Sequence, residues 1–141
     1  MAPDDMLFLV DPYPARLRAE HWLGFSGTRA IARRGVERFG GRARFVELDS
    51  LEAARTLEPE PRPVLVFVDA RHDYEAVRSD LLAWAPRLAD GGVIAVHDAM
   101  PCAPRPDLRD EAGACRAVGE VRASGWALIA YAESLALLAP R

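Results

Sequence analysis

The stretch PVLVFVDARHDYEAVRSDLLAWAPRLADGGVIAVHD, residues 63–98, decides the fold of this chain. Its first part, Val64 to Val68, is an unbroken apolar run, which is typical of a strand buried on both faces of a parallel sheet. From Tyr74 to Leu88, apolar residues recur every three or four positions, the spacing of a helix that packs on such a sheet. A second apolar run, Val93 to Val96, follows a pair of glycines. The order strand, helix, strand predicts a β-α-β crossover.

Acidic residues directly follow both predicted strands. Asp69 ends the first strand, and the second strand leads into His97 and Asp98. The two strands of a crossover are parallel and usually neighbours, so we expect Asp69 and Asp98 to emerge side by side at one edge of the sheet. In open α/β sheets, ligands bind outside the carboxyl ends of the strands. The sequence therefore predicts a binding site at these residues.

The rest of the chain continues the α/β pattern. Further strands are expected at 6–10, 44–48, 126–131 and 135–138, and further helices at 15–23, 26–39, 51–57 and 111–123. The last two strands are expected to form an antiparallel hairpin. The proline-rich residues 99–110 predict a loop over the ligand-binding edge. We therefore expect a mostly parallel sheet with a C-terminal hairpin, in a single domain over residues 1–141.

Two motifs resemble class I S-adenosylmethionine-dependent methyltransferases, and most closely a bacterial branch of that family. The first is the pattern Asp69-x-x-His72-x-Tyr74 after a strand, and the second is Gly-Gly-Val-Ile-x-x-His-Asp at residues 91–98. Strand, loop, helix and second strand agree with the family in order and length. The resemblance covers almost the whole chain and implies a Rossmann-like methyltransferase sheet.

The resemblance implies that three strand-end aspartates bind the cofactor, S-adenosylmethionine. Asp11 would accept hydrogen bonds from the two ribose hydroxyls. Asp49 would accept one from the adenine amine, and Asp69 would also contact the cofactor. From the residues alone, Asp11 could instead form a turn before Pro12, and Asp49 or Ser50 could simply cap the next helix.

The carboxylates and imidazoles at the two later strand ends could also hold a divalent metal ion. Related metal-dependent O-methyltransferases hold a cation at these positions, which implies Asp69, His97 and Asp98 as ligands. Carboxylates alone suit Mg²⁺, whereas histidines favour Mn²⁺, Fe²⁺ or Zn²⁺. His72 or His97 could act in catalysis by taking the proton of the substrate hydroxyl. Without a metal, Asp69 could fix the His-x-Tyr turn, and His97 could pair with a neighbouring loop.

One part of the family pattern is missing from this sequence. The family binds the methionine part of the cofactor with a Gly-x-Gly turn after its first strand, where only glycine lets the backbone approach closely. No glycine precedes Gly24. The resemblance therefore implies a domain without the first strand and helix. In the family, the first strand lies between the strands that we expect here at 6–10 and 64–68. Without it, these two strands are expected to pair directly with each other or with a partner.

Composition and charge narrow the possible functions. The chain has 141 residues, half of them apolar, and a formal net charge of −3, which indicates a compact soluble domain and no nucleic-acid-binding surface. All eighteen basic residues are arginine, which indicates a GC-rich bacterial source. No membrane span or signal peptide is evident, so the expected location is the cytoplasm.

Three functions remain open at this point. The first is a methyltransferase that acts on a hydroxyl of a small-molecule methyl acceptor. The second is a non-catalytic, truncated methyltransferase-like domain that serves interaction or assembly. The third is a different nucleotide-binding protein that uses the same sheet edge. A homo-oligomer is compatible with each of these functions.

Overall fold

The computed structural model describes residues 6–12, 25–58, 62–69, 71–99 and 111–141. The expected helix at residues 15–23 and nearly all of the expected proline-rich loop lie outside the described residues. The chain divides into two compact units, residues 1–56 and 57–141. A single domain over the whole chain stays a prediction.

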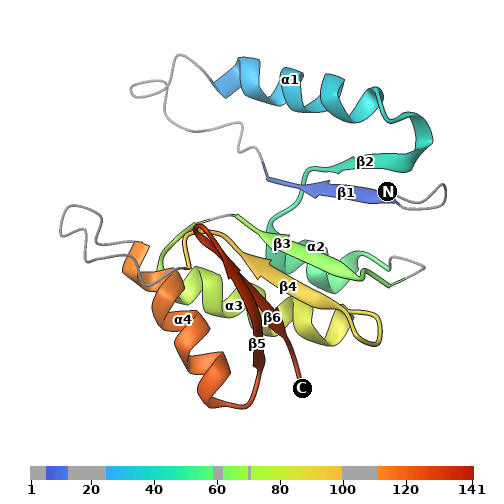
Figure 1. Cartoon of the computed structure of the whole chain (residues 1–141). Helices are drawn as coiled ribbons and strands as arrows, with labels where there is room; N and C mark the ends of the chain where they lie inside the picture. Colours follow the sequence, from blue (N-terminus) through green and yellow to red (C-terminus); the bar gives the residue numbers. More distant parts are fainter. Residues whose placement is uncertain (1–5, 13–24, 59–61, 70, 100–110) are drawn as a thin grey trace. The chain divides into compact units, whose positions relative to one another are not determined.

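The first unit contains two parallel strands and two helices (Figure 1). β1 (Leu7–Val10) pairs in parallel with β2 (Ala43–Val46). Between them lie α1 (Phe25–Glu37) and a short 3-10 turn (Gly40–Arg42), and α2 (Ser50–Thr56) follows β2. These elements confirm the pattern that the sequence predicts for this region, with shifts of one or two residues at their ends.

The second unit contains the predicted crossover. β3 (Leu65–Val68) runs parallel to β4 (Val93–Val96), and α3 (Tyr74–Trp84) connects them. A 3-10 turn (Ala85–Arg87) with Pro86 near its start ends this helix. Gly91 then turns the chain into β4 with a φ of 74°, a conformation that glycine adopts readily.

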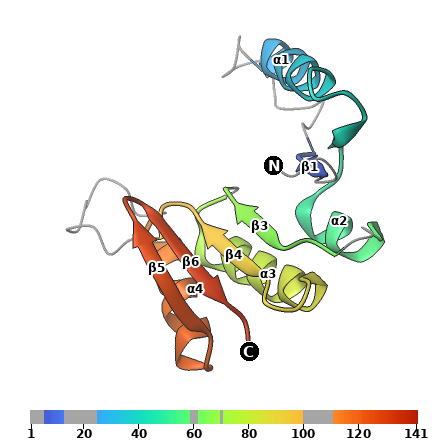
Figure 2. The ribbon, with the colours of Figure 1, turned by 45° about the vertical axis from the view of Figure 1, so that its right-hand side comes forward.

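The C-terminal hairpin joins the same sheet. After α4 (Glu111–Ala123), β5 (Ala127–Ala132) pairs antiparallel with β6 (Leu135–Ala139), and β6 pairs antiparallel with β4. The strand order is β3-β4-β6-β5 (Figure 2). The predicted α/β fold, with parallel pairs and a C-terminal antiparallel hairpin, is confirmed.

Helices α3 and α4 cover one face of this four-stranded sheet (Figures 1 and 2). Alternate side chains of the central strands point into this layer and are buried: Ile94, Val96, Ala136 and Leu138. They are matched by buried side chains of the helices: Val77, Leu81, Trp84, Ala114, Ala117, Val118 and Val121. Full burial of each large apolar side chain stabilises the fold by about 1.5–3 kcal/mol. This core fixes the strand ends that carry the candidate site.

β3 departs from the prediction. Its unbroken apolar run predicts burial on both faces, yet Leu65 and Phe67 are 54% and 53% exposed. Within the described chain, β3 is an edge strand that pairs with β4 alone, and β1 pairs with β2 in a separate sheet. Within its own unit, the predicted burial of β3 on both faces is therefore wrong. The run has the composition of a central strand, but the described part of its unit covers only one face.

None of the helices in the described ranges combines the length and the apolar character that crossing a bilayer requires.

Candidate functional site

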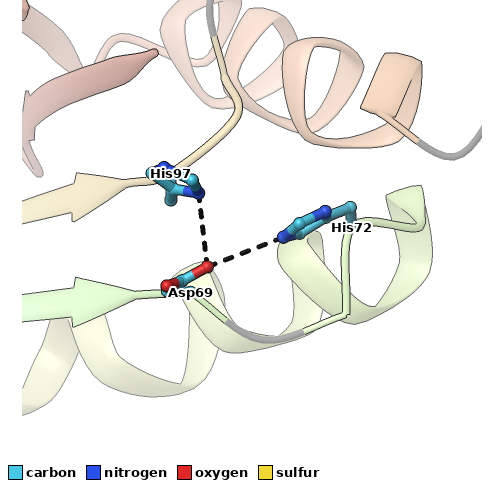
Figure 3. A group of neighbouring side chains, drawn as sticks. All are labelled: Asp69, His72 and His97. Carbon is cyan, nitrogen blue, oxygen red and sulfur yellow. Dashed lines mark ion pairs between the residues drawn. The ribbon is translucent and has the colours of Figure 1, made fainter. Parts of the chain in front are cut away.

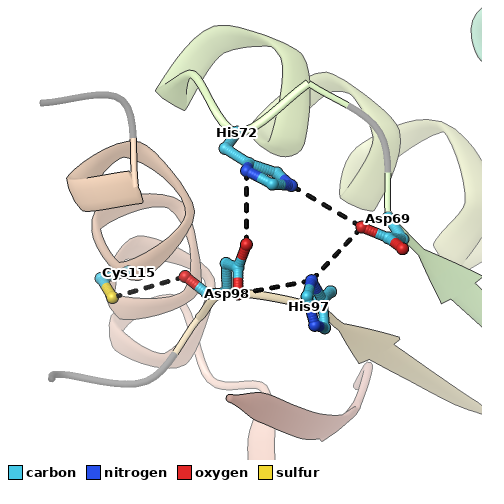
Figure 4. A network of polar contacts seen from close by, with 5 residues as sticks. All are labelled: Asp69, His72, His97, Asp98 and Cys115. Carbon is cyan, nitrogen blue, oxygen red and sulfur yellow. Dashed lines mark hydrogen bonds and ion pairs between the residues drawn. The ribbon is translucent and has the colours of Figure 1, made fainter. Parts of the chain in front are cut away.

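The carboxyl ends of β3 and β4 bring together Asp69, His72, His97 and Asp98 (Figure 4). The parallel register continues past the strands, because the His97 amide donates a hydrogen bond to the Val68 carbonyl at 2.9 Å. His97 Nδ1 lies 3.3 Å from Asp69 Oδ1 and 3.3 Å from Asp98 Oδ1. The prediction that these two strand-end carboxylates lie close enough to share one partner is confirmed.

His72 reaches the same place from the loop between β3 and α3. Its Nε2 lies 3.6 Å from Asp69 Oδ1, and its Nδ1 lies 3.4 Å from Asp98 Oδ2. The His72 and His97 rings are tilted by 53°, with their centroids 6.3 Å apart. Each histidine therefore faces both aspartates, and all four side chains are partly exposed.

Asp69, His72 and His97 have the geometry of a cation site (Figure 3). Among the described residues, one ligand atom from each of the three lies within 4.8 Å of the others. Ligands about 2.0–2.1 Å from an ion lie roughly 3 to 3.4 Å from one another in tetrahedral or octahedral sites. The 3.3 Å between His97 Nδ1 and Asp69 Oδ1 falls in this range. Asp98, expected as a ligand, contacts both histidines but lies outside this group of three.

The strongest sign of a missing partner is His97 Nδ1. This atom is buried and has no hydrogen bond to any described residue, although two carboxylate oxygens lie 3.3 Å away. A buried nitrogen without a partner costs free energy, so such atoms are rare in folded proteins. A divalent cation between His97 and Asp69 would give it a partner. The residues present therefore fit the predicted metal.

The backbone at Asp98 turns sharply to bring its carboxylate to the histidines. Its φ is 51°, in the left-handed region that aspartate tolerates better than most residues. The conformation is held from two directions. The neighbouring Ala99 amide donates to the Ser134 carbonyl at 3.0 Å, and Cys115 Sγ lies 3.9 Å from the Asp98 carbonyl oxygen (Figure 4). The hairpin and α4 thus both support this strand end.

Asp73 fixes the loop that carries His72. It is the N-cap of α3, and its Oδ1 accepts a hydrogen bond from the Ala76 amide at 3.0 Å. That bond, together with the Arg71 guanidinium 2.8 Å away, lowers the pKa of Asp73 below its ordinary value. Asp73 therefore belongs to the start of the helix and positions the adjacent His72.

Gly113 supports this loop from α4, and the sequence reasoning missed it. A Cβ atom at Gly113 would lie 2.4 Å from the Tyr74 backbone nitrogen and 2.5 Å from the His72 carbonyl oxygen. Only glycine allows α4 to approach the loop this closely. The available signal was a glycine inside a predicted helix, which often marks close packing.

Tyr74, the last residue of the first motif, ties α3 to α4. Its hydroxyl donates a hydrogen bond to Glu120 Oε2, while Arg78 donates to Glu120 Oε1 at 2.7 Å. The Arg116 guanidinium lies 4.0 Å from the centroid of the Tyr74 ring. The bond to Glu120 raises the pKa of Tyr74 and lowers the pKa of Glu120. Tyr74 therefore has a structural role, since it ties α3 to α4 next to the loop that carries His72.

The two predicted cofactor residues of the first unit follow strand ends, as expected. Asp11 comes after β1, and its amide donates to the Val46 carbonyl at 3.0 Å. Asp49 precedes α2, and its Oδ1 accepts a hydrogen bond from the Leu51 amide at 2.9 Å. Asp49 therefore caps α2, one of the two roles that its sequence position suggested. Contacts of Asp11, Asp49 and Asp69 with the cofactor stay predictions.

Comparisons with known proteins identify the family of this chain. Residues 3–99 match a family model described as a methyltransferase domain. A search of curated proteins finds no match. Among solved structures, the chain is similar to a protein from Corynebacterium glutamicum, with 19% identity and a TM-score of 0.63 over 95% of this chain and 60% of that one.

Two further structures show the same likeness. One is an SAH-bound methyltransferase from Podospora anserina, with 16% identity and a TM-score of 0.61 over 95% of this chain and 59% of that one. The other is a TDP-rhamnose 3′-O-methyltransferase of calicheamicin biosynthesis, with 20% identity and a TM-score of 0.56 over 95% and 58% of the two chains. The chain thus spans about 60% of the length of these structures. Because the family model covers more than half of its residues, the chain belongs to the class I S-adenosylmethionine-dependent methyltransferase family.

Proposed function

We propose that this chain is the larger part of an enzyme that transfers a methyl group from S-adenosylmethionine to a hydroxyl of a small molecule, with a divalent cation at the β3 and β4 ends. The family supports methyl transfer. One similar structure is an O-methyltransferase, and another is bound to SAH, which is what the cofactor becomes once its methyl group has left. The activity is a proposal for the whole protein, because the chain spans only part of these relatives.

The observation that carries the proposal is the buried Nδ1 of His97, which faces two carboxylates without a hydrogen bond. Asp69 and His97 would hold the cation. Their mixed oxygen and nitrogen donors favour Mn²⁺, Fe²⁺ or Zn²⁺ over Mg²⁺. A cation there would make a coordinated substrate hydroxyl easier to deprotonate.

His72 can serve this chemistry in one of two ways, since the lone pair of its Nε2 can go either to the cation or to a proton. As a ligand, it would complete the group with Asp69 and His97. As a general base, it would take the proton of the substrate hydroxyl. In both cases Asp98, 3.4 Å from His72 Nδ1, would orient the ring and stabilise its N–H.

Titration calorimetry of the untagged chain with Mn²⁺, Zn²⁺ and Mg²⁺ tests the cation site. We expect Mn²⁺ and Zn²⁺ to bind more tightly than Mg²⁺, and Asp69→Ala to abolish the signal while circular dichroism shows an unchanged fold. Asp90→Ala, at an exposed acid before β4, is the matched control and should bind as the wild type does. Equal binding by Asp69→Ala would place the site elsewhere.

The variant His72→Asn separates the two roles of that histidine. If His72 is a ligand, its replacement weakens metal binding. If it is the base, metal binding persists while methyl transfer by the complete enzyme is lost.

A second candidate function, a non-catalytic module for interaction or assembly, is favoured by a different observation. In the described part of its unit, β3 pairs with β4 alone and carries the exposed apolar side chains Leu65 and Phe67, which suit the attachment of another polypeptide.

A further inference from the structure

The group formed by Asp69, His72 and His97 has a donor set that narrows the choice of cation. It offers two imidazole nitrogens and one carboxylate oxygen, and these atoms lie within 4.8 Å of one another (Figure 3). Hard cations such as Mg²⁺ and Ca²⁺ take oxygen ligands. Thiolates, which favour Zn²⁺, Cu⁺ and iron–sulfur clusters, are absent from this group. Two histidines and one carboxylate with open coordination positions are typical of non-haem Fe²⁺ sites.

The group also leaves room for a ligand from solution. Its side chains are all partly exposed, Asp69 by 48%, His97 by 36% and His72 by 31%. Structural zinc sites, in contrast, are closed by four protein ligands. An ion held only by these three side chains would therefore keep coordination positions open to an exogenous ligand.

Asp98 prepares His72 to act as a ligand. A histidine binds a metal in its neutral form, and its other ring nitrogen usually donates its N–H to a carboxylate or carbonyl. Asp98 Oδ2 lies 3.4 Å from His72 Nδ1, so Asp98 suits this role. The lone pair is then on His72 Nε2, which lies 3.6 Å from Asp69 Oδ1. Asp98 therefore orients a ligand, which agrees with its place outside the group of three.

His97 supplies the second nitrogen, and an apolar ring lies beside it. His97 Nδ1 is buried without a hydrogen bond to any described residue, so this atom is available to an ion. The centroid of the Phe67 ring lies 6.4 Å from that of His97. Apolar neighbours control the access of water to a metal site. Such a neighbour suits an uncharged ligand better than a charged one.

We propose that Asp69, His72 and His97 form a ferrous iron site whose open positions bind a small uncharged ligand of the class of O₂ and nitric oxide. The proposal rests on the cation site of the proposed function, and on His72 as a ligand of that cation. It does not require that the chain transfers a methyl group. It adds the identity of the cation and the class of its exogenous ligand.

Electron paramagnetic resonance of the metal-free, untagged full chain tests this site. Under argon, the chain receives an equivalent of Fe²⁺ and then nitric oxide, which forms a paramagnetic adduct with ferrous iron that has an open position. We expect the wild type to give the high-spin ferrous–nitrosyl signal in proportion to the chain. Pulsed measurements on this signal should detect both imidazoles of the group as iron ligands.

Variants assign the signal to its residues, with circular dichroism to check the fold. His72→Asp keeps a ligand at this position but removes its imidazole, so the signal should persist with only the His97 nitrogen detected. Asp98→Asn should keep both imidazoles and weaken Fe²⁺ binding about 10–100-fold, the usual effect of losing a residue that orients a ligand. Asp90→Ala, at the exposed acid before β4, should match the wild type in both measurements.

The outcomes that would overturn the proposal differ from those that refute the cation site itself. If Mn²⁺ or Zn²⁺ binds through Asp69 but Fe²⁺ gives no nitrosyl signal, the cation site stands and the open ferrous site is wrong. If the wild type shows a single coordinated imidazole, His72 is not a ligand. If Asp69→Ala keeps the full signal, the iron binds elsewhere on the chain. If no cation binds at all, the cation site of the proposed function is wrong, and the ferrous site with it.

Discussion

Gly113→Ala is the sharpest test of how α4 supports the candidate site. The new Cβ would lie 2.4 Å from the Tyr74 nitrogen and 2.5 Å from the His72 carbonyl oxygen, whereas real Cβ contacts stay beyond 3.0 Å. Either the helix or the His72 loop must therefore move by at least 0.6 Å, the difference between 2.4 and 3.0 Å. Both atoms are backbone, so no side chain can rotate away to relieve the contact.

The expected cost follows from two opposing effects. Overpacking of this kind costs about 1–3 kcal/mol, while alanine in place of a helical glycine returns up to about 1 kcal/mol. We expect Gly113→Ala to lower the free energy of unfolding by about 1–2 kcal/mol in urea. It should also weaken Mn²⁺ binding, because His72 moves with its loop.

Gly119→Ala is the control, because it lies in the same helix and a Cβ there meets no atom within 4 Å. It should stabilise the chain by about 0.5–1 kcal/mol and leave metal binding unchanged. If Gly113→Ala matched Gly119→Ala in both measurements, the close approach of α4 to the loop would be wrong.

Three further predictions concern the helix contacts and the cofactor. Glu120→Gln should lower the pH at which Tyr74 ionises, measured by ultraviolet difference absorbance, because the hydrogen bond to Glu120 raises the pKa of Tyr74. The stability that this bond contributes is lost only as pH rises through the raised pKa. An unchanged titration of Tyr74 would contradict the pairing. The bond from Ala76 lowers the pKa of Asp73, so this group's contribution is present above about pH 4 and lost as pH falls through the lowered value. Asp73→Asn should therefore lose less stability in acid than the wild type, and an equal loss would rule out this role. S-adenosylmethionine should bind this chain with a millimolar Kd or weaker, because the sequence lacks the Gly-x-Gly turn that binds the methionine part of the cofactor. Losing two or three hydrogen bonds of about 1.5–3 kcal/mol each lowers the affinity at least about a hundredfold. Micromolar binding by calorimetry would refute the reasoning.

The sequence predicts the crossover and its site because both depend on local patterns. Unbroken apolar runs identify the two strands, a period of about 3.6 residues identifies the helix, and the rule for parallel strands then brings Asp69 and Asp98 together. That step needs no knowledge of distant contacts. The structure confirms it, with His97 Nδ1 equally far from both carboxylates.

Other features depend on which elements meet across the fold, and the sequence could not supply them. The apolar run Val64 to Val68 indicates that its residues suit burial on both faces of the sheet. It does not indicate whether other elements cover both faces. The sequence of α4 shows a glycine, yet not that His72 and Tyr74 pack against it. An aspartate at position 49 suits both a helix cap and a cofactor ligand, so the sequence does not distinguish the two roles. Only the hydrogen bond from the Leu51 amide shows that Asp49 caps the helix.

Asp69 is the side chain on which the proposed cation site depends most. It follows β3 directly, and its Oδ1 lies 3.3 Å from His97 Nδ1 and 3.6 Å from His72 Nε2, so it faces both histidines. Its side chain, 48% exposed, is also the most exposed of the four in the site. A cation bound between Asp69 and His97 would fix this carboxylate and give His97 Nδ1 the partner that it lacks among the described residues. Asp69→Ala removes the one carboxylate of the group formed by Asp69, His72 and His97, so it should abolish binding, whereas loss of His72 leaves Asp69 and His97 in place.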